Sequence, residues 1–205
     1  FWYSLVISVM SVVLILLCCS MCAWYIVRVN GVLSKILYYL FIFSMVVPFQ
    51  MVMFTLAKTA DTLKLNTPYN ICIIYLGFGA GLAVFMFTGF VKGIPLEIEE
   101  AAHVDGANKL QVFIRVVLPI VAPGIVAVAI YTFINAWNEF LYSLILINSS
   151  SKMTVSVALN SLEGQEVLDW GTMMAASTIV VIPSVVFFML IQKRIAGGLA
   201  QGSIK

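Results

Sequence analysis

The sequence predicts an all-α integral membrane protein with five transmembrane helices and one polar helix–turn–helix between the third and the fourth. Its 205 residues are 62% hydrophobic and only 10% charged, whereas soluble domains are about a quarter charged. The charged residues gather between apolar runs that are each long enough to cross the ~30 Å hydrocarbon core. Because the net charge is only +2 and no dense basic cluster occurs, the composition excludes a nucleic-acid-binding protein.

Runs without charge, or with a single carboxylate, place the spans. We expect helices over about 4–27, 36–57, 70–91, 121–147 and 172–192, which make one transmembrane domain over 1–205. The first run is too long for a signal-peptide core and has no basic segment before it, so it is predicted to be a span. The chain starts without methionine and already inside an apolar run. We therefore expect that further N-terminal sequence precedes it.

Lysine and arginine predict the orientation, since they concentrate in cytoplasmic loops. With five spans, one side of the membrane holds most of them: Arg28, Lys35, Lys92, Lys109, Arg115, Lys193, Arg194 and Lys205. The other side holds only Lys58, Lys64 and Lys152. This asymmetry places segment 92–119 and the C-terminus in the cytoplasm, and the first residues outside.

Glycines and prolines within the spans have structural interpretations. Pro48 and Pro183 predict either functional kinks or bends that packing absorbs. Gly77, Gly79 and Gly81 predict close helix packing. No G-x-x-x-x-G-K-[ST] run occurs, so the chain is not itself an ATPase and is not predicted to be an enzyme.

No metal or redox site is predicted. The pair Cys19-x-x-Cys22 has a suitable spacing, but no second pair and no histidine accompany it, so we expect buried thiols.

The polar segment 92–119 reads as two short helices around a turn. Pro95 can start the first helix, and Glu97, Glu99 and Glu100 in its first turn suit the positive end of the helix dipole. Gly106 ends that helix, since glycine adopts positive φ without steric cost. A second helix is predicted from about Asn108, and Pro119 is expected to stop it. Its predicted apolar face is Leu110, Phe113, Ile114, Val117 and Leu118.

On pattern alone, this segment could be an amphipathic loop that rests on lipid headgroups. Its residues, however, resemble the EAA loop of ATP-binding-cassette (ABC) importer permeases: Glu100-Ala101-Ala102, then Gly106, then Val116-x-Leu118-Pro119. The family pattern has isoleucine where Val116 stands. The resemblance implies the type I ABC importer permease fold and a cytoplasmic loop that docks on an ATPase. The implied coupling residues are Glu100, Ala101, Ala102, Asp105, Gly106, Leu118 and Pro119.

The fourth predicted span contains the one acidic residue within a span, Glu139. Asn135, Asn138 and Glu139 share one helix face by the i, i+3, i+4 rule. Because ionisable groups at membrane depth face a cavity or a partner, two interpretations stay open. The face either lines or gates the translocation pathway, or it clamps two helices together while Trp137 anchors at the interface.

Segment 137–140, W-N-E-F, also resembles a stretch of sugar-type permeases. Two further segments resemble the same maltose and multiple-sugar group: the stretch from Asp169-Trp170-Gly171 to Met174-Ala175-Ala176, and the tail Gly198-Leu199-Ala200-Gln201-Gly202. The resemblance implies the membrane subunit of a binding-protein-dependent sugar importer. Its implied partners are a homologous second permease, an ABC ATPase dimer that holds ATP and Mg²⁺, an extracytoplasmic sugar-binding protein and the lipid bilayer. No cofactor is expected on this chain.

Two other functions stay open. An importer of the same class for polyamine, amino acid or peptide is argued against only by the sugar-type segments. A stand-alone secondary transporter needs several intramembrane charges or broken helices, and this chain offers Glu139 alone. His103, the one histidine, is interpreted as a solvated helix residue.

Overall fold

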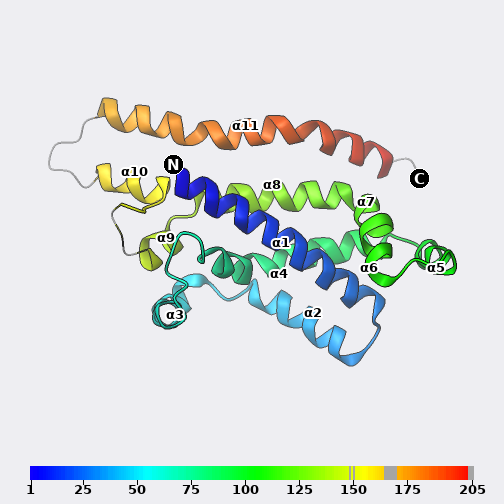
Figure 1. Cartoon of the computed structure of the whole chain (residues 1–205). Helices are drawn as coiled ribbons and strands as arrows, with labels where there is room; N and C mark the ends of the chain where they lie inside the picture. Colours follow the sequence, from blue (N-terminus) through cyan, green and yellow to red (C-terminus); the bar gives the residue numbers. More distant parts are fainter. Residues whose placement is uncertain (148, 150, 164–169, 203–205) are drawn as a thin grey trace. The chain divides into compact units, whose positions relative to one another are not determined.

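A computed structural model shows the chain as helices and connecting segments (Figure 1). It describes residues 1–147, 149, 151–163 and 170–202, with side chains for all of these except 163 and 191–202. No strand occurs in that part of the chain. The elements are α1 (Trp2–Arg28), α2 (Val32–Ser44), α3 (Phe49–Thr62), α4 (Cys72–Lys92), α5 (Leu96–Val104), α6 (Lys109–Val112), the π-helix η1 (Phe113–Val117), α7 (Leu118–Ile120), α8 (Ala122–Asn138), α9 (Leu141–Leu146), α10 (Val155–Glu163) and α11 (Trp170–Gly202).

Three described helices are long and apolar enough to cross a membrane: α1, α4 and α11 as far as Leu190. The number rises to five if each of two bent pairs counts as one span. These pairs are α2 with α3, and Lys109–Ile120 with α8. The number of spans expected from the sequence, five, equals the upper figure, although the second bent pair differs from the expected span over 121–147.

The expected helix over 36–57 is interrupted between Ser44 and Phe49. Pro48 is the N-cap of α3 and has φ −71° and ψ 140°, which is extended backbone. Proline has no N–H for a helical hydrogen bond and disfavours helical backbone in the residue before it. The kink expected at Pro48 is therefore a complete break, whereas Pro183 lies inside α11 without interrupting it.

The helix expected over 121–147 is also interrupted. The helix α8 ends at Asn138, and α9 begins at Leu141. Glu139 and Phe140, which were predicted to continue the helix, form the connection between these two elements.

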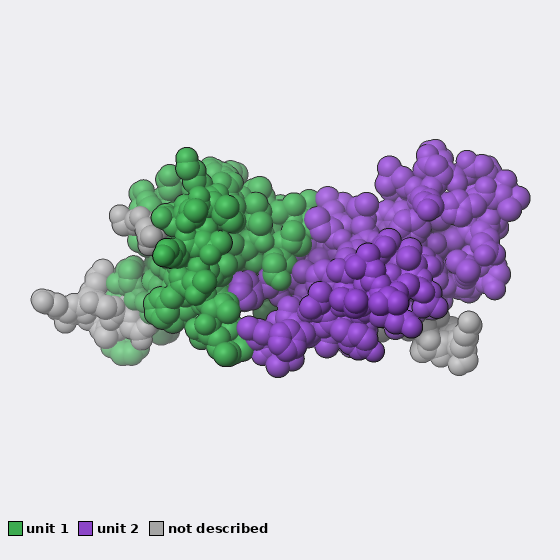
Figure 2. Space-filling model, turned by 90° about the horizontal axis from the view of Figure 1, so that it is seen from below, with its two compact units in different colours: residues 1–14, 48–77, 130–191 green, residues 15–47, 78–129, 192–205 purple. Residues whose placement is uncertain are grey.

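The chain divides into two compact units, coloured in Figure 2: unit 1 is 1–14, 48–77 and 130–191, and unit 2 is 15–47, 78–129 and 192–205. Within unit 1, Trp137 is only 1% exposed. Its indole Nε1 donates to the carbonyl oxygen of Val180 at 2.9 Å, and Phe133 stacks on Phe187 with ring centroids 4.0 Å apart. Trp137 thus holds α8 to α11, so the expectation of an interfacial anchor is wrong.

Within unit 2, a buried apolar cluster lies beneath the polar segment. Its members are Val91, Ile94, Val112, Phe113, Val117 and Val121. The predicted apolar face is confirmed for Phe113 and Val117 but wrong for Leu110 and Ile114, which are 57% and 52% exposed. The π-helix η1 explains part of the difference, because its wider turn changes which residues share a face.

The sequence predicted that Pro119 stops the second helix, but in the structure the helical run continues past it. Pro119 sits in the first turn of α7, and the helical run continues to Ile120 before a bend of 78° into α8. Pro119 has no N–H to donate to the carbonyl of Arg115. The preceding N–H of Leu118 instead reaches back to the carbonyl oxygen of Phe113, a bond of π-helical length. The π turn thereby accommodates the proline.

The α4 glycines differ in how closely α2 and α1 approach them. A Cβ placed on Gly81 would lie 2.8 Å from the backbone oxygen of Phe41 and 2.7 Å from side-chain atoms of Ser44 and Met45. A Cβ on Gly89 would meet nothing within 4 Å. The prediction of close packing is confirmed at Gly81, where α2 approaches α4.

We expect Gly81→Ala to lower the free energy of unfolding by about 1–3 kcal/mol, because a backbone oxygen cannot move aside as a side-chain tip can. Gly89→Ala is the matched control on the same helix and should leave stability unchanged or slightly raised. Thermal unfolding of the purified protein in detergent measures both. Equal midpoints for the two variants would contradict the close approach of α2.

Candidate functional site

The turn of segment 92–119 is held by its own backbone. Gly106 has φ +86°, as the sequence predicted. Its N–H donates to the oxygen of His103, and the N–H of Ala107 donates to the oxygen of Ala102, each at 3.0 Å. This pair of bonds is the Schellman motif that ends many helices. The His103 ring adds a 2.9 Å hydrogen bond between Nδ1 and the oxygen of Ala107, so this histidine stabilises the turn.

Both short helices begin close to where the sequence predicts. Pro95 is the N-cap of α5 rather than its first residue. In α6, the Asn108 side chain accepts from the Gln111 N–H, and the Gln111 side chain accepts from the Asn108 N–H, both at 2.9 Å. This reciprocal capping box satisfies two donors that have no partner inside a helix. The helix–turn–helix is therefore locally rigid.

The predicted coupling residues lie in two places on this segment. The first group surrounds the turn: Glu100, Ala101, Asp105 and Gly106 are exposed, and Ala102 is half-buried against the apolar cluster. The second group, Leu118 and Pro119, belongs to α7. Leu118 packs on the cluster, while Pro119 is exposed. The turn thus presents small residues and carboxylates on an open surface.

Glu99 is a residue of this site that the sequence reasoning missed. It is 3% exposed, whereas its neighbour Glu100 is exposed. Its Oε1 accepts from Arg28 Nε at 2.8 Å and lies 2.6 Å from Nη2 of the same guanidinium, which makes an ion pair. Its Oε2 accepts from Trp24 Nε1 at 2.8 Å. Both carboxylate oxygens are therefore occupied by donors from the end of α1.

A weak signal for this contact is present in the sequence. Trp24 and Arg28 are four residues apart, so they share one face at the end of the first helix. A hollow of about 310 Å³ adjoins them. It is lined by Trp24, Tyr25, Arg28, Val29, Leu96, Glu99, Glu100, His103 and Lys109.

The second predicted site, on α8, is not brought together as expected. Asn135 and Asn138 are exposed, and their side-chain amides donate to carbonyls of their own helix, those of Tyr131 and Ile134. Glu139 lies beyond the helix end and turns elsewhere. The three side chains therefore do not form one cluster, because α8 ends before Glu139. Their roles in the pathway stay predictions.

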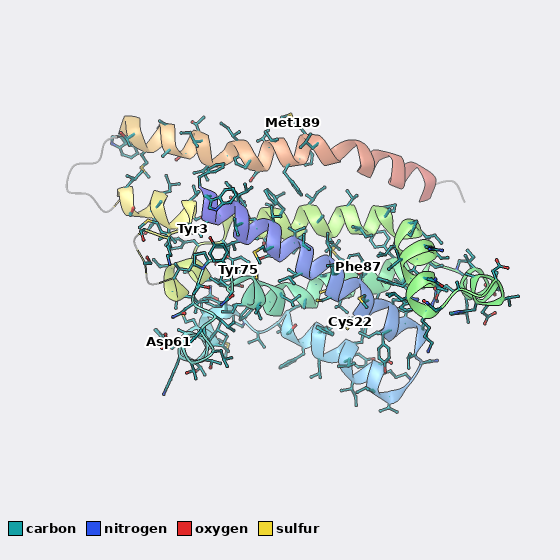
Figure 3. The ribbon with its side chains drawn as sticks, viewed as in Figure 1. Tyr3, Cys22, Asp61, Tyr75, Phe87 and Met189 are labelled. Carbon is teal, nitrogen blue, oxygen red and sulfur yellow. The ribbon has the colours of Figure 1, made fainter. Side chains whose placement is uncertain are left out.

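Glu139 accepts hydrogen bonds from three donors within unit 1. Its Oε2 accepts from the Tyr142 N–H at 2.8 Å, the Ser143 N–H at 3.4 Å and the hydroxyl of Tyr75 at 3.3 Å. Tyr75, labelled in Figure 3, comes from α4, and it also packs edge-on against the Tyr142 ring. A carboxylate at the start of α9 satisfies its free N–H groups. This geometry favours the clamp interpretation for Glu139.

The fold and the loop together define a class of protein. This protein has several helices long and apolar enough to cross a membrane and an exposed polar helix–turn–helix, as expected of the importer permeases that the sequence resembles. The chain belongs to the family described as binding-protein-dependent transport system inner membrane component, whose model matches residues 4–201.

Named relatives and solved structures agree with this family. The chain is 31% identical over 202 residues to the probable starch degradation products transport system permease protein AmyC of Thermoanaerobacterium thermosulfurigenes, covering 98% of this chain and 74% of the relative. It is 30% identical over 210 residues to the multiple sugar-binding transport system permease protein MsmG of Streptococcus mutans, covering 100% and 76%. The fold matches a bacterial ABC transporter that imports alginate, with a TM-score of 0.72, 19% identity, and coverage of 100% of this chain and 74% of that one.

We expect Glu139→Leu to destabilise the protein by about 1–3 kcal/mol, since three donors lose their acceptor. Glu139→Gln keeps an acceptor oxygen and should stay close to wild type. Asn138→Leu is the control, because its exposed amide bonds only its own helix. Denaturant or thermal unfolding in detergent measures all three variants. A Glu139→Leu protein as stable as wild type would show that the carboxylate is not a clamp.

Proposed function

We propose that this chain is the membrane-spanning subunit of an ATP-driven carbohydrate importer. It would form the translocation pathway with a second, homologous permease and couple to a separate ATPase dimer through segment 92–119. The names of AmyC and MsmG, for starch degradation products and multiple sugars, support a sugar cargo. An extracytoplasmic binding protein would deliver the sugar, and ATP and Mg²⁺ would bind the ATPase rather than this chain.

The exposed turn of segment 92–119 carries this proposal. Ala101 has a small side chain and Gly106 has none, so a partner can approach the backbone closely. Glu100 offers a carboxylate for a cation across the interface. The Schellman motif and the capping box hold this surface in one shape. A preformed surface binds without a large ordering cost.

The proposed mechanism is alternating access. We call segment 92–119 the docking loop. Closure of the ATPase dimer on ATP would move the docking loops of the two permeases together, and the permease pair would rock to open the pathway outward. ATP shifts this equilibrium only by as much as the docking contacts differ between the two states. The exposed turn supplies these contacts on the permease side.

Gly106→Leu tests the docking role. The change forces a branched side chain into positive φ and covers the exposed backbone of the turn, although no atom of the described residues beyond the two chain neighbours lies within 4 Å of the new Cβ. We expect the protein to insert in the membrane but to lose ATPase co-purification and sugar uptake. Gly106→Asn, which tolerates this backbone, should keep the turn and lose part of the ATPase binding.

Gly31→Asn is the matched control, since Gly31 also has open space around it but lies between α1 and α2. It should transport at the wild-type rate. Wild-type uptake by Gly106→Leu at equal membrane levels would refute the docking assignment.

The proposed orientation predicts which residues a membrane-impermeant thiol reagent reaches. Lys109 and Lys152 are both exposed. In a variant without the four native cysteines, Lys109→Cys should react only after the cells are permeabilised, because the lysine and arginine distribution places it inside. Lys152→Cys should react in intact cells. The reverse labelling pattern would overturn the orientation.

A further inference from the structure

We propose that Trp24, Arg28 and Glu99 form the link that carries movement of the docking loop into α1. The three residues would thus be positioning residues for coupling. This inference rests on the function proposed above. It assigns a role to three residues that are not among the predicted coupling residues.

All hydrogen bonds and the ion pair of this link lie within unit 2. The Glu99 carboxylate accepts one N–H from Arg28 and one from Trp24, and Arg28 Nη2, which forms the ion pair with Oε1, donates to the Ile94 oxygen at 3.0 Å. The Arg28 and Glu99 side chains are 18% and 5% exposed. A largely buried ion pair with charge-assisted hydrogen bonds fixes the distance and angle between its two elements.

Both arms of the docking loop meet the same face of α1. Trp24, Val27 and Arg28 follow the i, i+3, i+4 spacing of one helix face. Glu99 lies on α5, the first arm, while the Trp24 ring packs on Phe113 of η1, the second arm, with centroids 5.3 Å apart. Figure 1 shows the last turns of α1 (blue) next to these green helices. A push on either arm therefore acts on α1.

The fold of the loop itself does not depend on this link. The Schellman bonds join Gly106 and Ala107 to α5, and the capping box closes the start of α6, all within the loop. The side-chain hydrogen bonds that Glu99 makes within the described part of the chain go, in contrast, to Trp24 and Arg28 of α1. A buried carboxylate directed entirely away from the loop connects elements rather than shaping the turn.

The helix α1 can transmit a displacement because it is unbroken from Trp2 to Arg28. Its first turn makes its own specific contacts within unit 1. The Ser4 hydroxyl accepts from the Val155 N–H at 2.8 Å, and the Phe1 ring packs edge-on against Trp137 with centroids 5.4 Å apart. The end of α1 is thus held to the docking loop within unit 2, and its start, together with Phe1, contacts α8 and α10 within unit 1.

The test measures sugar transported per ATP hydrolysed, with the complete complex in lipid vesicles. We expect Glu99→Gln and Arg28→Gln to lower this ratio about tenfold, within the usual range of coupling energies, while ATP hydrolysis continues. Lys35→Gln is the control, since it removes an exposed cation from α2, next in the chain, and should leave the ratio unchanged. A wild-type ratio in both Gln variants, even with less complex assembled, would overturn the proposal.

A double-cysteine variant tests the proposal if the Glu99→Gln and Arg28→Gln chains do not assemble into a complex. In a background without native cysteines, Arg28→Cys with Glu99→Cys should lose coupling, and a short reversible thiol cross-linker between them should restore it. Failure of the cross-link to restore coupling would overturn the link. If wild-type complex shows no ATP-driven sugar uptake at all, the proposed function fails instead, so the two failures are distinguishable.

Discussion

The contact between Glu99 and the end of α1 is the constraint that fixes how the polar segment is attached to the rest of unit 2. Removing a carboxylate and a guanidinium from water costs several kcal/mol, and only good geometry offsets that cost. Here the two carboxylate oxygens and the guanidinium are all engaged, with Trp24 and the Ile94 carbonyl completing the set. The pair has few other arrangements available, because any displacement leaves a buried charge without its partner. If the loop couples to an ATPase as proposed, it needs such a fixed attachment, which apolar contacts alone provide poorly.

Local features of segment 92–119 could be predicted from the sequence, because residues close together in the chain determine them. The positive φ of Gly106 and the start of α6 beside Asn108 both follow from backbone conformational preferences and short-range hydrogen bonds. The attachment of Glu99 could not be predicted in this way. Arg28 lies 71 residues from Glu99 in the chain, and the basic residue served only to orient the protein. Position in the first turn of a helix suggested the same role for Glu97, Glu99 and Glu100, yet Glu99 is buried and Glu100 exposed. Only the packing of α1 against the loop distinguishes them.

Helix continuity was the other feature that the sequence predicted incompletely. Apolar runs predict where helices can cross the membrane, but they do not show where a helix breaks within a run. Pro48 begins a new helix, whereas Pro183 and Pro119 are accommodated inside helical runs, the latter after a π turn. The difference lies in the neighbouring backbone. Proline leaves the carbonyl four residues before it without its helical donor, so either another donor bonds that carbonyl or the helix ends. The same reasoning applies to Glu139. It was predicted on a continuous face with Asn135 and Asn138, but the helix ends one residue before it.

Glu99 and Glu139 show a common physical principle in this chain. Between membrane helices the hydrophobic effect supplies little driving force, since lipid tails are as apolar as the side chains. Specific geometry must then come from packing and from a small number of polar contacts. Each of these two carboxylates lies at the start of a short helix and connects it to a longer one, α5 to α1 in unit 2 and α9 to α4 in unit 1. In a chain with only 10% charged residues, these two carboxylates each hold a short helix to a longer one. The exposed Glu97 and Glu100, beside the same helix start as Glu99, show that burial and the facing donors, rather than position in the sequence, give a carboxylate this role.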